Sequence, residues 1–135
     1  MTWYYNGEPL EEIPEGYVAF VYQITNLESR KKYIGKKIFT HTRKQNIKGK
    51  TRKKTVKKES NWKEYFGSNL GLLADLAQLG QDRFKREVLV LCKTKGTANY
   101  HEAKFQMINN VLESDEWYND QIWVRVHRSH IRLNE

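Results

Sequence analysis

Two tyrosines lie at similar places in two short segments that have the composition of β-strands. Tyr22 falls in the run 16–25, which is rich in aromatic and β-branched residues, and Tyr33 opens a second run at 33–37. The polar residues 26–30 between them favour a turn. We therefore predict a β-hairpin over residues 16–39. Because strand side chains alternate between faces, both phenols can share one face if the register, which the sequence leaves open, brings them level.

A single carboxylate, Glu102, stands on the body of a helix predicted from about Ala98 to Leu112. It lies in a polar strip with Asn99, Gln106, Asn109 and Asn110, between two apolar sides that we expect to be packed: Ala98, Phe105, Ile108 and Leu112 on one, and Tyr100, Ala103, Met107 and Val111 on the other. One alternative is an exposed polar face. Exposed helix faces usually carry many Lys and Glu residues, however, so amides around one acid indicate a site.

Glu102 suits the chemistry of phosphodiester cleavage. That reaction needs a positioned water, neutralisation of the phosphate charge and help for the leaving oxygen, and a divalent cation commonly shares these tasks. Mg²⁺ keeps most of its waters and accepts few protein ligands, so one carboxylate is enough to hold it. Glu102 is therefore the candidate ligand for a single Mg²⁺ (or Mn²⁺) ion.

The charge of the chain points to a polyanionic partner. Its net charge is +8, its pI is about 9.5 and 13% of its residues are aromatic, a combination typical of proteins that bind nucleic acid. Residues 40–58 contain nine Lys and Arg residues and no acid, so we expect this insertion to be mobile unless an anion binds it. The alternative is a solvated loop without a partner. The candidate nucleic-acid-binding residues are Lys37, His41, Lys44, Lys48, Lys50, Arg52, Lys53, Lys54, Lys57 and Lys58.

The remaining patterns predict one α/β (α+β) domain over residues 1–135, with a central sheet of about three strands that starts with the hairpin and is flanked by helices. Pro9 and Pro14 discourage regular structure in residues 1–15, which we interpret as an aromatic N-terminal arm. Residues 51–57 alternate weakly and could add a short strand.

Helices and the third strand are predicted over residues 60–112. Ser60 is expected to cap one helical turn and Gly67 to end it. Ser68 or Asn69 then caps a helix that ends at Gly80, whose stripe of Leu70, Leu73, Ala74, Leu76 and Ala77 should face the sheet. The third strand is expected at 84–92, and a C-terminal segment follows at 113–135, with a strand or extended stretch at 121–126.

The lone Cys92 excludes an intrachain disulfide. No apolar run is long enough to span a bilayer, and the first residues lack the pattern of a signal peptide. We expect a soluble, cytoplasmic protein.

The two tyrosine segments also resemble a known motif. Phe20-Val21-Tyr22, ten residues, and then Tyr33-Ile34-Gly35-Lys36 are similar to the paired motif of the GIY-YIG nuclease superfamily, and the likeness, closest to small phage-type endonucleases, runs from about Gly16 to Ile122. The resemblance implies a metal-dependent DNA endonuclease, homing or restriction-like, working in a bacterial cytoplasm if it is phage-encoded. It leaves open a homodimer and a non-catalytic nucleic-acid-binding module.

The resemblance also implies site residues. The family arginine stands ten positions beyond the second tyrosine, where this chain has Arg43; Glu102 and Asn119 match the metal-binding glutamate and the later asparagine, and Tyr65, with His41 as the alternative, matches a further aromatic. In this scheme Glu102 holds the metal on the leaving side, Tyr22 or Tyr33 helps to deprotonate water, and Arg43 and Lys36 stabilise the phosphate.

Two departures from the family pattern affect these assignments. The first motif has Phe-Val in place of Gly-Ile, and the basic insertion separates Arg43 from Tyr65. Arg52 is therefore an alternative to Arg43. A tyrosine base also needs nearby cations, because an ordinary phenol has a pKa of about 10.

Overall fold

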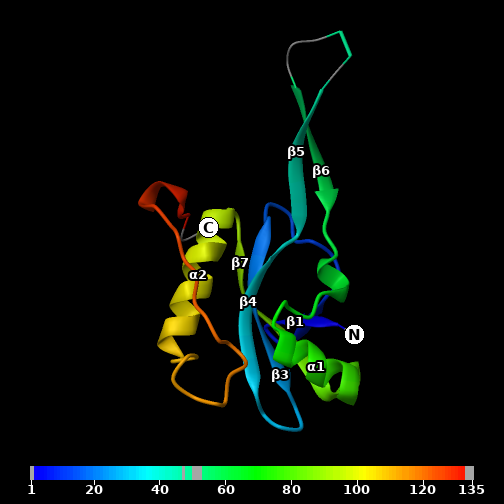
Figure 1. Cartoon of the computed structure of the whole chain (residues 1–135). Helices are drawn as coiled ribbons and strands as arrows, with labels where there is room; N and C mark the ends of the chain where they lie inside the picture. Colours follow the sequence, from blue (N-terminus) through cyan, green and yellow to red (C-terminus); the bar gives the residue numbers. More distant parts are fainter. Residues whose placement is uncertain (1, 47, 50–52, 133–135) are drawn as a thin grey trace.

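The computed structural model describes residues 2–46, 48–49 and 53–132, and it shows a mixed α+β domain (Figure 1). A five-stranded sheet has the order β2-β1-β7-β3-β4, and β5 and β6 form a separate two-stranded sheet. The elements are β1 Trp3–Tyr5, β2 Glu8–Leu10, β3 Ala19–Asn26, β4 Lys32–Ile38, β5 Thr40–Asn46, β6 Lys53–Glu59, η1 Trp62–Glu64, α1 Leu70–Leu79, η2 Gln81–Arg83, β7 Phe84–Cys92, α2 Lys95–Ile108 and η3 Arg128–His130.

The predicted tyrosine hairpin is present as β3 and β4, which pair antiparallel. Tyr22 lies opposite Gly35 and Tyr33 lies opposite Ile24, so the two tyrosines are diagonal neighbours on one face. Asn26 forms the turn, because its Oδ1 accepts hydrogen bonds from two backbone N–H groups in the segment that follows, at 3.0 and 3.2 Å. The register that the sequence left open therefore brings the two rings together.

The sheet is larger than the predicted three strands, because the N-terminal residues are not a separate arm. β1 and β2 form a hairpin, and β1 pairs in parallel with β7. Asn6 and Gly7 connect them with positive φ angles of 52° and 81°, as the favoured two-residue hairpin turn requires. Pro9 is tolerated because β2 is an edge strand. Trp3 anchors the hairpin in the core, where its indole N–H donates to the carbonyl of Trp62 at 2.7 Å.

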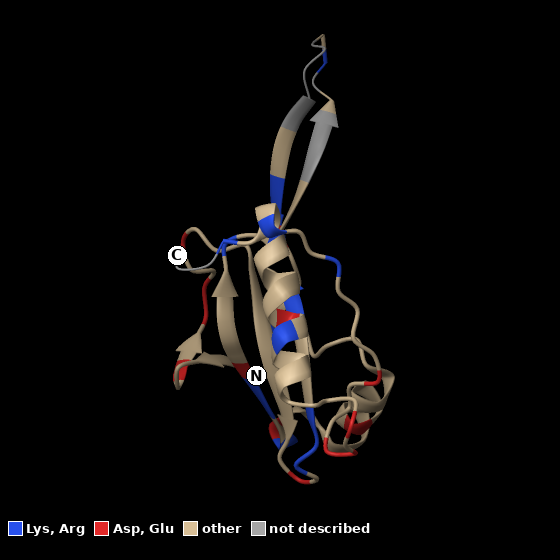
Figure 2. Cartoon of the chain, turned by 90° about the vertical axis from the view of Figure 1, so that its left-hand side faces the viewer, with Lys and Arg blue, Asp and Glu red and all other residues tan. Residues whose placement is uncertain are grey.

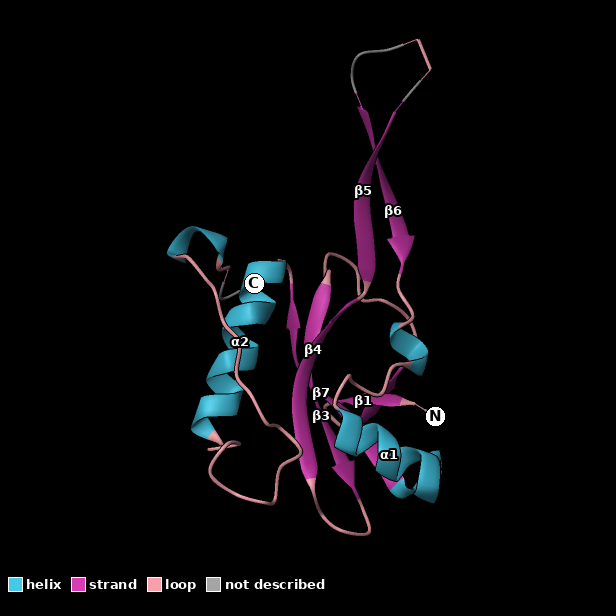
Figure 3. Ribbon diagram, viewed as in Figure 1, coloured by secondary structure: helices cyan, strands magenta, loops and turns pink. Residues whose placement is uncertain are grey.

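Different helices pack against the two faces of the sheet (Figure 3). One face, which carries Phe20 and Tyr22, packs against η1 and α1 through buried residues such as Trp62 and Leu72. The other face packs against α2 and the segment after it. The two helices therefore lie on opposite sides of β3 and β4, and the tyrosines belong to the α1 side.

Helix α1 ends at Gly80, as predicted, and its cap is Asn69, whose Oδ1 accepts from the N–H of Leu72 at 2.9 Å. The predicted apolar stripe is correct for Leu73 and Leu76, which pack against the core. It is wrong for Leu70, which is 83% exposed, and it left out Leu72, the buried residue of the helix. Ser60 does not cap η1; its hydroxyl donates to the carbonyl of Ile38 at 2.5 Å.

Helix α2 begins three residues earlier than predicted, where Thr94 caps it by accepting from the N–H of Thr97 at 3.0 Å. The expectation of two packed sides is wrong. Ala98 on one predicted side and Ala103 on the other are buried, whereas Ile108 and Met107 on the same two sides are exposed. Each predicted side is therefore only partly packed.

The basic insertion is folded as β5 and β6, which we call the basic hairpin. It projects from the body of the domain (Figure 1). The short strand expected within residues 51–57 overlaps β6, but its partner β5 was not predicted. Lys50 and Arg52 lie outside the described residues, as do the side chains of Arg43, Lys44, Lys53 and Lys54. Within the described ranges we find no helix with the length and apolarity needed to cross a membrane.

Candidate active site

Strand β4 is an edge strand, and polar side chains bind its outward-facing backbone groups. Asn119 uses both ends of its amide on Ile34: Oδ1 accepts from the N–H at 3.1 Å and Nδ2 donates to the carbonyl at 2.9 Å. Gln106 of α2 donates to the same carbonyl at 2.9 Å. An edge strand otherwise leaves such groups unpaired. Asn119 is only 8% exposed, so it fastens the C-terminal segment to β4.

Glu102 lies one helical turn before Gln106, against the same edge. Its carboxylate is 3.6 Å from the Nζ of Lys36, and its side chain is 15% exposed. Lys36 also donates to the side-chain oxygen of Asn99. Burial raises the pKa of Glu102, while the charge and hydrogen bonds of Lys36 act in the opposite direction. Lys36 is therefore paired with α2 and is not on the tyrosine face.

The tyrosine face is built around Gly35. The rings of Tyr22 and Tyr33 are 6.2 Å apart between centroids, and Tyr65 meets Tyr22 edge-on at 6.1 Å. A Cβ at Gly35 would lie 2.4 Å from the Tyr22 hydroxyl and 2.9 Å from the Tyr33 ring. Gly67, with a φ of 85°, approaches the same two rings. Only glycine at position 35 allows the phenols to meet over β4.

The two phenols differ in access to solvent. Tyr22 is 1% exposed, and burial, followed by the neighbouring Tyr65 and Tyr33, raises its pKa well above the usual value. Burial also raises the pKa of the partly buried Tyr33, although a hydrogen bond with Ser68 opposes the shift. The charge of Glu102 raises both pKa values. The negative charge of Glu102 therefore disfavours the phenolate form of both tyrosines from its place at the edge of β4.

Lys37, rather than Lys36, is the cation on the tyrosine face. Its Nζ lies 4.1 Å from the centroid of the Tyr65 ring, and burial lowers its pKa. The sequence assigned Lys37 only to nucleic-acid binding. The period of two in a strand could have placed it correctly, because Tyr33, Gly35 and Lys37 share a face.

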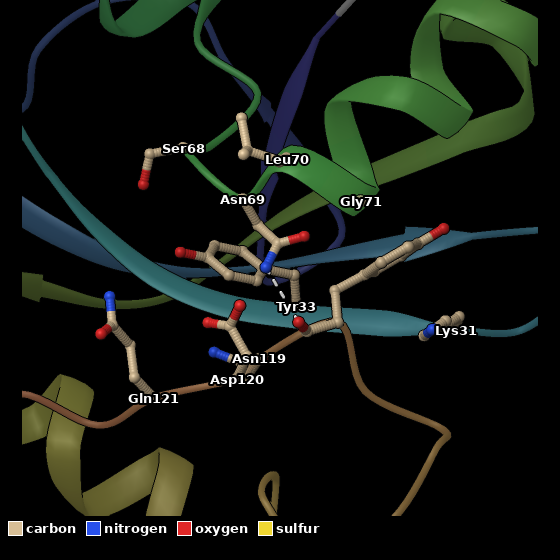
Figure 4. A pocket seen from close by; sticks show the side chains of 10 residues that line it. Lys31, Tyr33, Ser68, Asn69, Leu70, Gly71, Asn119, Asp120 and Gln121 are labelled. Carbon is tan, nitrogen blue, oxygen red and sulfur yellow. Dashed lines mark hydrogen bonds between the residues drawn. The ribbon is translucent and has the colours of Figure 1, made fainter.

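A pocket of about 410 Å³ opens beside Tyr33 (Figure 4). Asn119 lines it, whereas Tyr22 and Glu102 do not. Asn69 spans the space by donating to the carbonyl of Tyr118 at 2.9 Å. Sequence reasoning gave no role in the site to five of the polar lining residues, Lys31, Ser68, Asn69, Asp120 and Gln121. Ser68 and Asp120 both affect the pKa of Tyr33. The pocket is lined by Lys31, Tyr33, Ser68, Asn69, Leu70, Gly71, Tyr118, Asn119, Asp120 and Gln121.

The other predicted residues are divided between the body and the basic hairpin. Tyr65 joins the tyrosine face, whereas its alternative, His41, lies in β5 opposite Lys58. Arg43 pairs with Val56 in the backbone register of β5 and β6. The structure therefore groups Tyr22, Tyr33 and Tyr65 on the tyrosine face, and it places Glu102 on the α2 side of β4 beside Lys36.

Arg86 supports this arrangement and was not recognised in the sequence. It is 1% exposed, and its guanidinium carbon lies 4.5 Å from the ring centroids of both Trp3 and Phe66. Its Nη1 donates to the carbonyl of Tyr65 at 2.8 Å. Burial lowers its pKa to about 10. Arg86 thus connects β7 to the chain that carries Tyr65.

Arg86→Ala is expected to lower the free energy of unfolding by about 3 kcal/mol, because it removes a charged hydrogen bond and two cation–π contacts. Urea unfolding with an unchanged m-value measures this loss. The control is Arg83→Ala, whose ion pair with Glu28 is exposed and contributes under about 1 kcal/mol. Equal losses in the two variants would show that Arg86 does not anchor the core.

Comparisons with known proteins support the motif. The family model described as "Putative endonuclease segE, GIY-YIG domain" matches residues 3–122. Comparisons with curated proteins and with solved structures gave no match. The matched range contains the tyrosine hairpin, the basic hairpin, both α-helices and Asn119. The chain therefore belongs to the SegE family of GIY-YIG endonuclease domains.

Proposed function

We propose that the chain is a DNA endonuclease that hydrolyses phosphodiester bonds with one Mg²⁺ or Mn²⁺ ion. The observation that carries the proposal is the packing of Tyr22 and Tyr33 over Gly35 of β4, with the mostly buried Glu102 of α2 beside the adjacent Lys36. A carboxylate and two phenols of this kind can bind a metal, orient a water and receive its proton.

The donor set of the described residues fits Mg²⁺. Glu102 is a mostly buried carboxylate at the edge of the site, and the described part of the chain has no group of three His, Cys, Asp or Glu side chains that could form a closed cage. Mg²⁺ is usually held by one or two carboxylates and keeps several waters. When bound by Glu102, it would supply charge neutralisation for the phosphate and the leaving oxygen. Lys36 is the present partner of Glu102 and would lose that contact.

Tyr33 is better placed than Tyr22 to accept a proton. It lines the open pocket, whereas Tyr22 is almost fully buried. We assign to Tyr33 the transfer of a proton from water to its phenolate oxygen, and to Tyr22 the positioning of Tyr33 and Tyr65. Lys37 lies on the same face, with its Nζ over the Tyr65 ring. Arg43 and Arg52 remain candidates for binding the phosphate.

Tyr33→Phe is expected to slow cleavage about 10²- to 10⁴-fold, the usual contribution of a general base. Because the pKa of Tyr33 is raised, its phenolate is scarce at neutral pH. The parent's rate should therefore increase about tenfold for each pH unit between about pH 7 and 9. Rates of plasmid nicking at several pH values measure both effects. Tyr33→Phe should lose the increase with pH, and Tyr22→Phe should retain it; the reverse pattern would exchange the two roles.

A further inference from the structure

We propose that the basic hairpin inserts as a two-stranded ribbon into the major groove of B-form DNA, beside the bond that the active site cleaves. This inference deepens the proposed function. It rests on DNA being the substrate, and it does not require that cleavage be observed.

The shape of the basic hairpin suits this groove. Within the described ranges, β5 and β6 pair only with each other, and the hairpin stands away from the body (Figures 1 and 3). The major groove is about 12 Å wide and admits a two-stranded β-ribbon, whereas the minor groove is about 6 Å wide. A hairpin without a third strand or a helix to cover it is marginally stable in water. A groove that encloses both strands would supply the missing contacts.

The charges lie on both faces of the ribbon. Lys57 is opposite Thr42 and Lys58 is opposite His41, and all four side chains are exposed. Because successive strand residues point to opposite faces, the two lysines place an ammonium group on each face. A groove presents phosphates along both of its walls, so this distribution matches it. A ribbon that lay flat on one DNA backbone would need its cations on one face. Apart from Glu59 at the end of β6, the acidic residues of the described ranges lie on the body, away from the hairpin (Figure 2).

The base of the hairpin is fixed relative to the active site. Phe39 alone separates β4 from β5; it is buried and packs against Phe20 and Trp62, with ring centroids 4.7 and 5.0 Å away. Directly after β6, the N–H of Ser60 donates to the carbonyl of Phe39 at 2.8 Å. The hairpin therefore extends directly from the strand that carries Tyr33.

This connection sets a distance along the DNA. His41 follows Tyr33 by eight positions, which span at most about 26 Å at about 3.3 Å per residue. That length corresponds to about eight base pairs at about 3.4 Å each. We therefore expect the base of the hairpin, with His41 and its partner Lys58, to enter the groove within one helical turn of the cleaved bond.

Other nucleic acids fit less well. The sequence has no Phe, Tyr or Trp between Phe39 and Trp62, so the hairpin has no aromatic ring on which the bases of a single strand could stack. Double-stranded RNA has a deep, narrow major groove that does not accept protein side chains. The chemistry and shape of the basic hairpin together favour duplex DNA.

Methylation interference tests the groove directly. The variant Glu102→Gln is bound to a duplex that the parent cleaves. If no cleavage is found, the salt dependence of the charge variants described below tests the hairpin on a random duplex. Methyl groups at guanine N7, in the major groove, should prevent binding at positions up to about eight base pairs to one side of the cleaved bond. Methyl groups at adenine N3, in the minor groove, should have no effect there. Interference only at adenine N3, or at neither position, would overturn the proposal even if the chain is a nuclease.

A pair of variants connects the result to the hairpin. Lys57→Gln/Lys58→Gln should reduce the slope of log affinity against log salt by about 1.8, since each phosphate contact contributes about 0.9, and should weaken the interference at guanine N7. The control Lys85→Gln/Lys104→Gln removes the same charge from the body. It should keep the parent's salt slope and the parent's interference at guanine N7. Thermal unfolding should be the same for both double variants. Equal slopes and equal interference in the two would show that the hairpin does not enter the groove.

Discussion

Replacing Glu102 by glutamine is expected to slow DNA cleavage at least a thousandfold, that is by about 4 kcal/mol or more of transition-state stabilisation. Glutamine keeps the size of the side chain and an oxygen that can accept from Lys36, but it removes the negative charge that would hold Mg²⁺. The pKa of Glu102 is raised by burial, so its ionised form is disfavoured by the fold. The free energy of unfolding should therefore change by less than about 1 kcal/mol.

The control for this variant is Glu113→Gln, which neutralises an exposed carboxylate beyond the end of α2. Rates of plasmid nicking at saturating Mg²⁺ measure the effect, and urea unfolding measures the stability of each variant. Cleavage by Glu102→Gln at the parent's rate would remove Glu102 from the metal site. A variant that is unfolded would give no information on the metal, so circular dichroism accompanies the assay.

Gly35→Ala is expected to reduce the cleavage rate more than a hundredfold and to destabilise the domain by about 1–3 kcal/mol. Its Cβ would lie 2.4 Å from the Tyr22 hydroxyl, and the almost fully buried Tyr22 ring has no space to move without displacing Tyr33 or Tyr65. Displacement of a catalytic group by about 1 Å can cost a hundredfold in rate. Nicking rates and urea unfolding provide the two measurements.

Gly71→Ala is the matched control, because a Cβ there meets nothing closer than 3.3 Å and alanine suits the helix α1. It should cleave DNA at close to the parent's rate. Full activity in Gly35→Ala would mean that the close approach of the tyrosines to β4 is not required for cleavage.

The parts of the fold that depend on local interactions could be predicted from the sequence. The hairpin of β3 and β4 was predicted correctly, because its aromatic and β-branched runs and its polar turn all act within a few residues. The first two strands were missed because Pro9 was taken to prevent a strand, although Asn6-Gly7 is a strong hairpin signal. The parallel pairing of β1 with β7 joins distant segments, and no local pattern reports it.

Some residues of the candidate site could also be identified from local sequence patterns. The sequence identified Tyr22 and Tyr33, which the structure packs together over Gly35, and Glu102, which it places on α2 beside Lys36. The sequence analysis placed Lys36 in the catalytic scheme and Lys37 only in nucleic-acid binding. In the structure Lys36 pairs with Glu102 of α2, and Lys37 lies over the Tyr65 ring on the tyrosine face. Arg86 could not be found, because a buried arginine between two aromatic rings depends on residues brought together only by folding.

Cleavage of supercoiled plasmid tests the central claim most directly. The purified chain is incubated with the plasmid in Mg²⁺, in EDTA, and in Mg²⁺ after replacement of Glu102 by glutamine. We predict nicked or linear DNA in Mg²⁺ alone, with intact plasmid in the other two reactions. Cleavage that persists in EDTA would contradict the metal-dependent mechanism. Intact plasmid in all three reactions, confirmed with branched and single-stranded substrates, would contradict the enzyme and favour a nucleic-acid-binding module without catalysis.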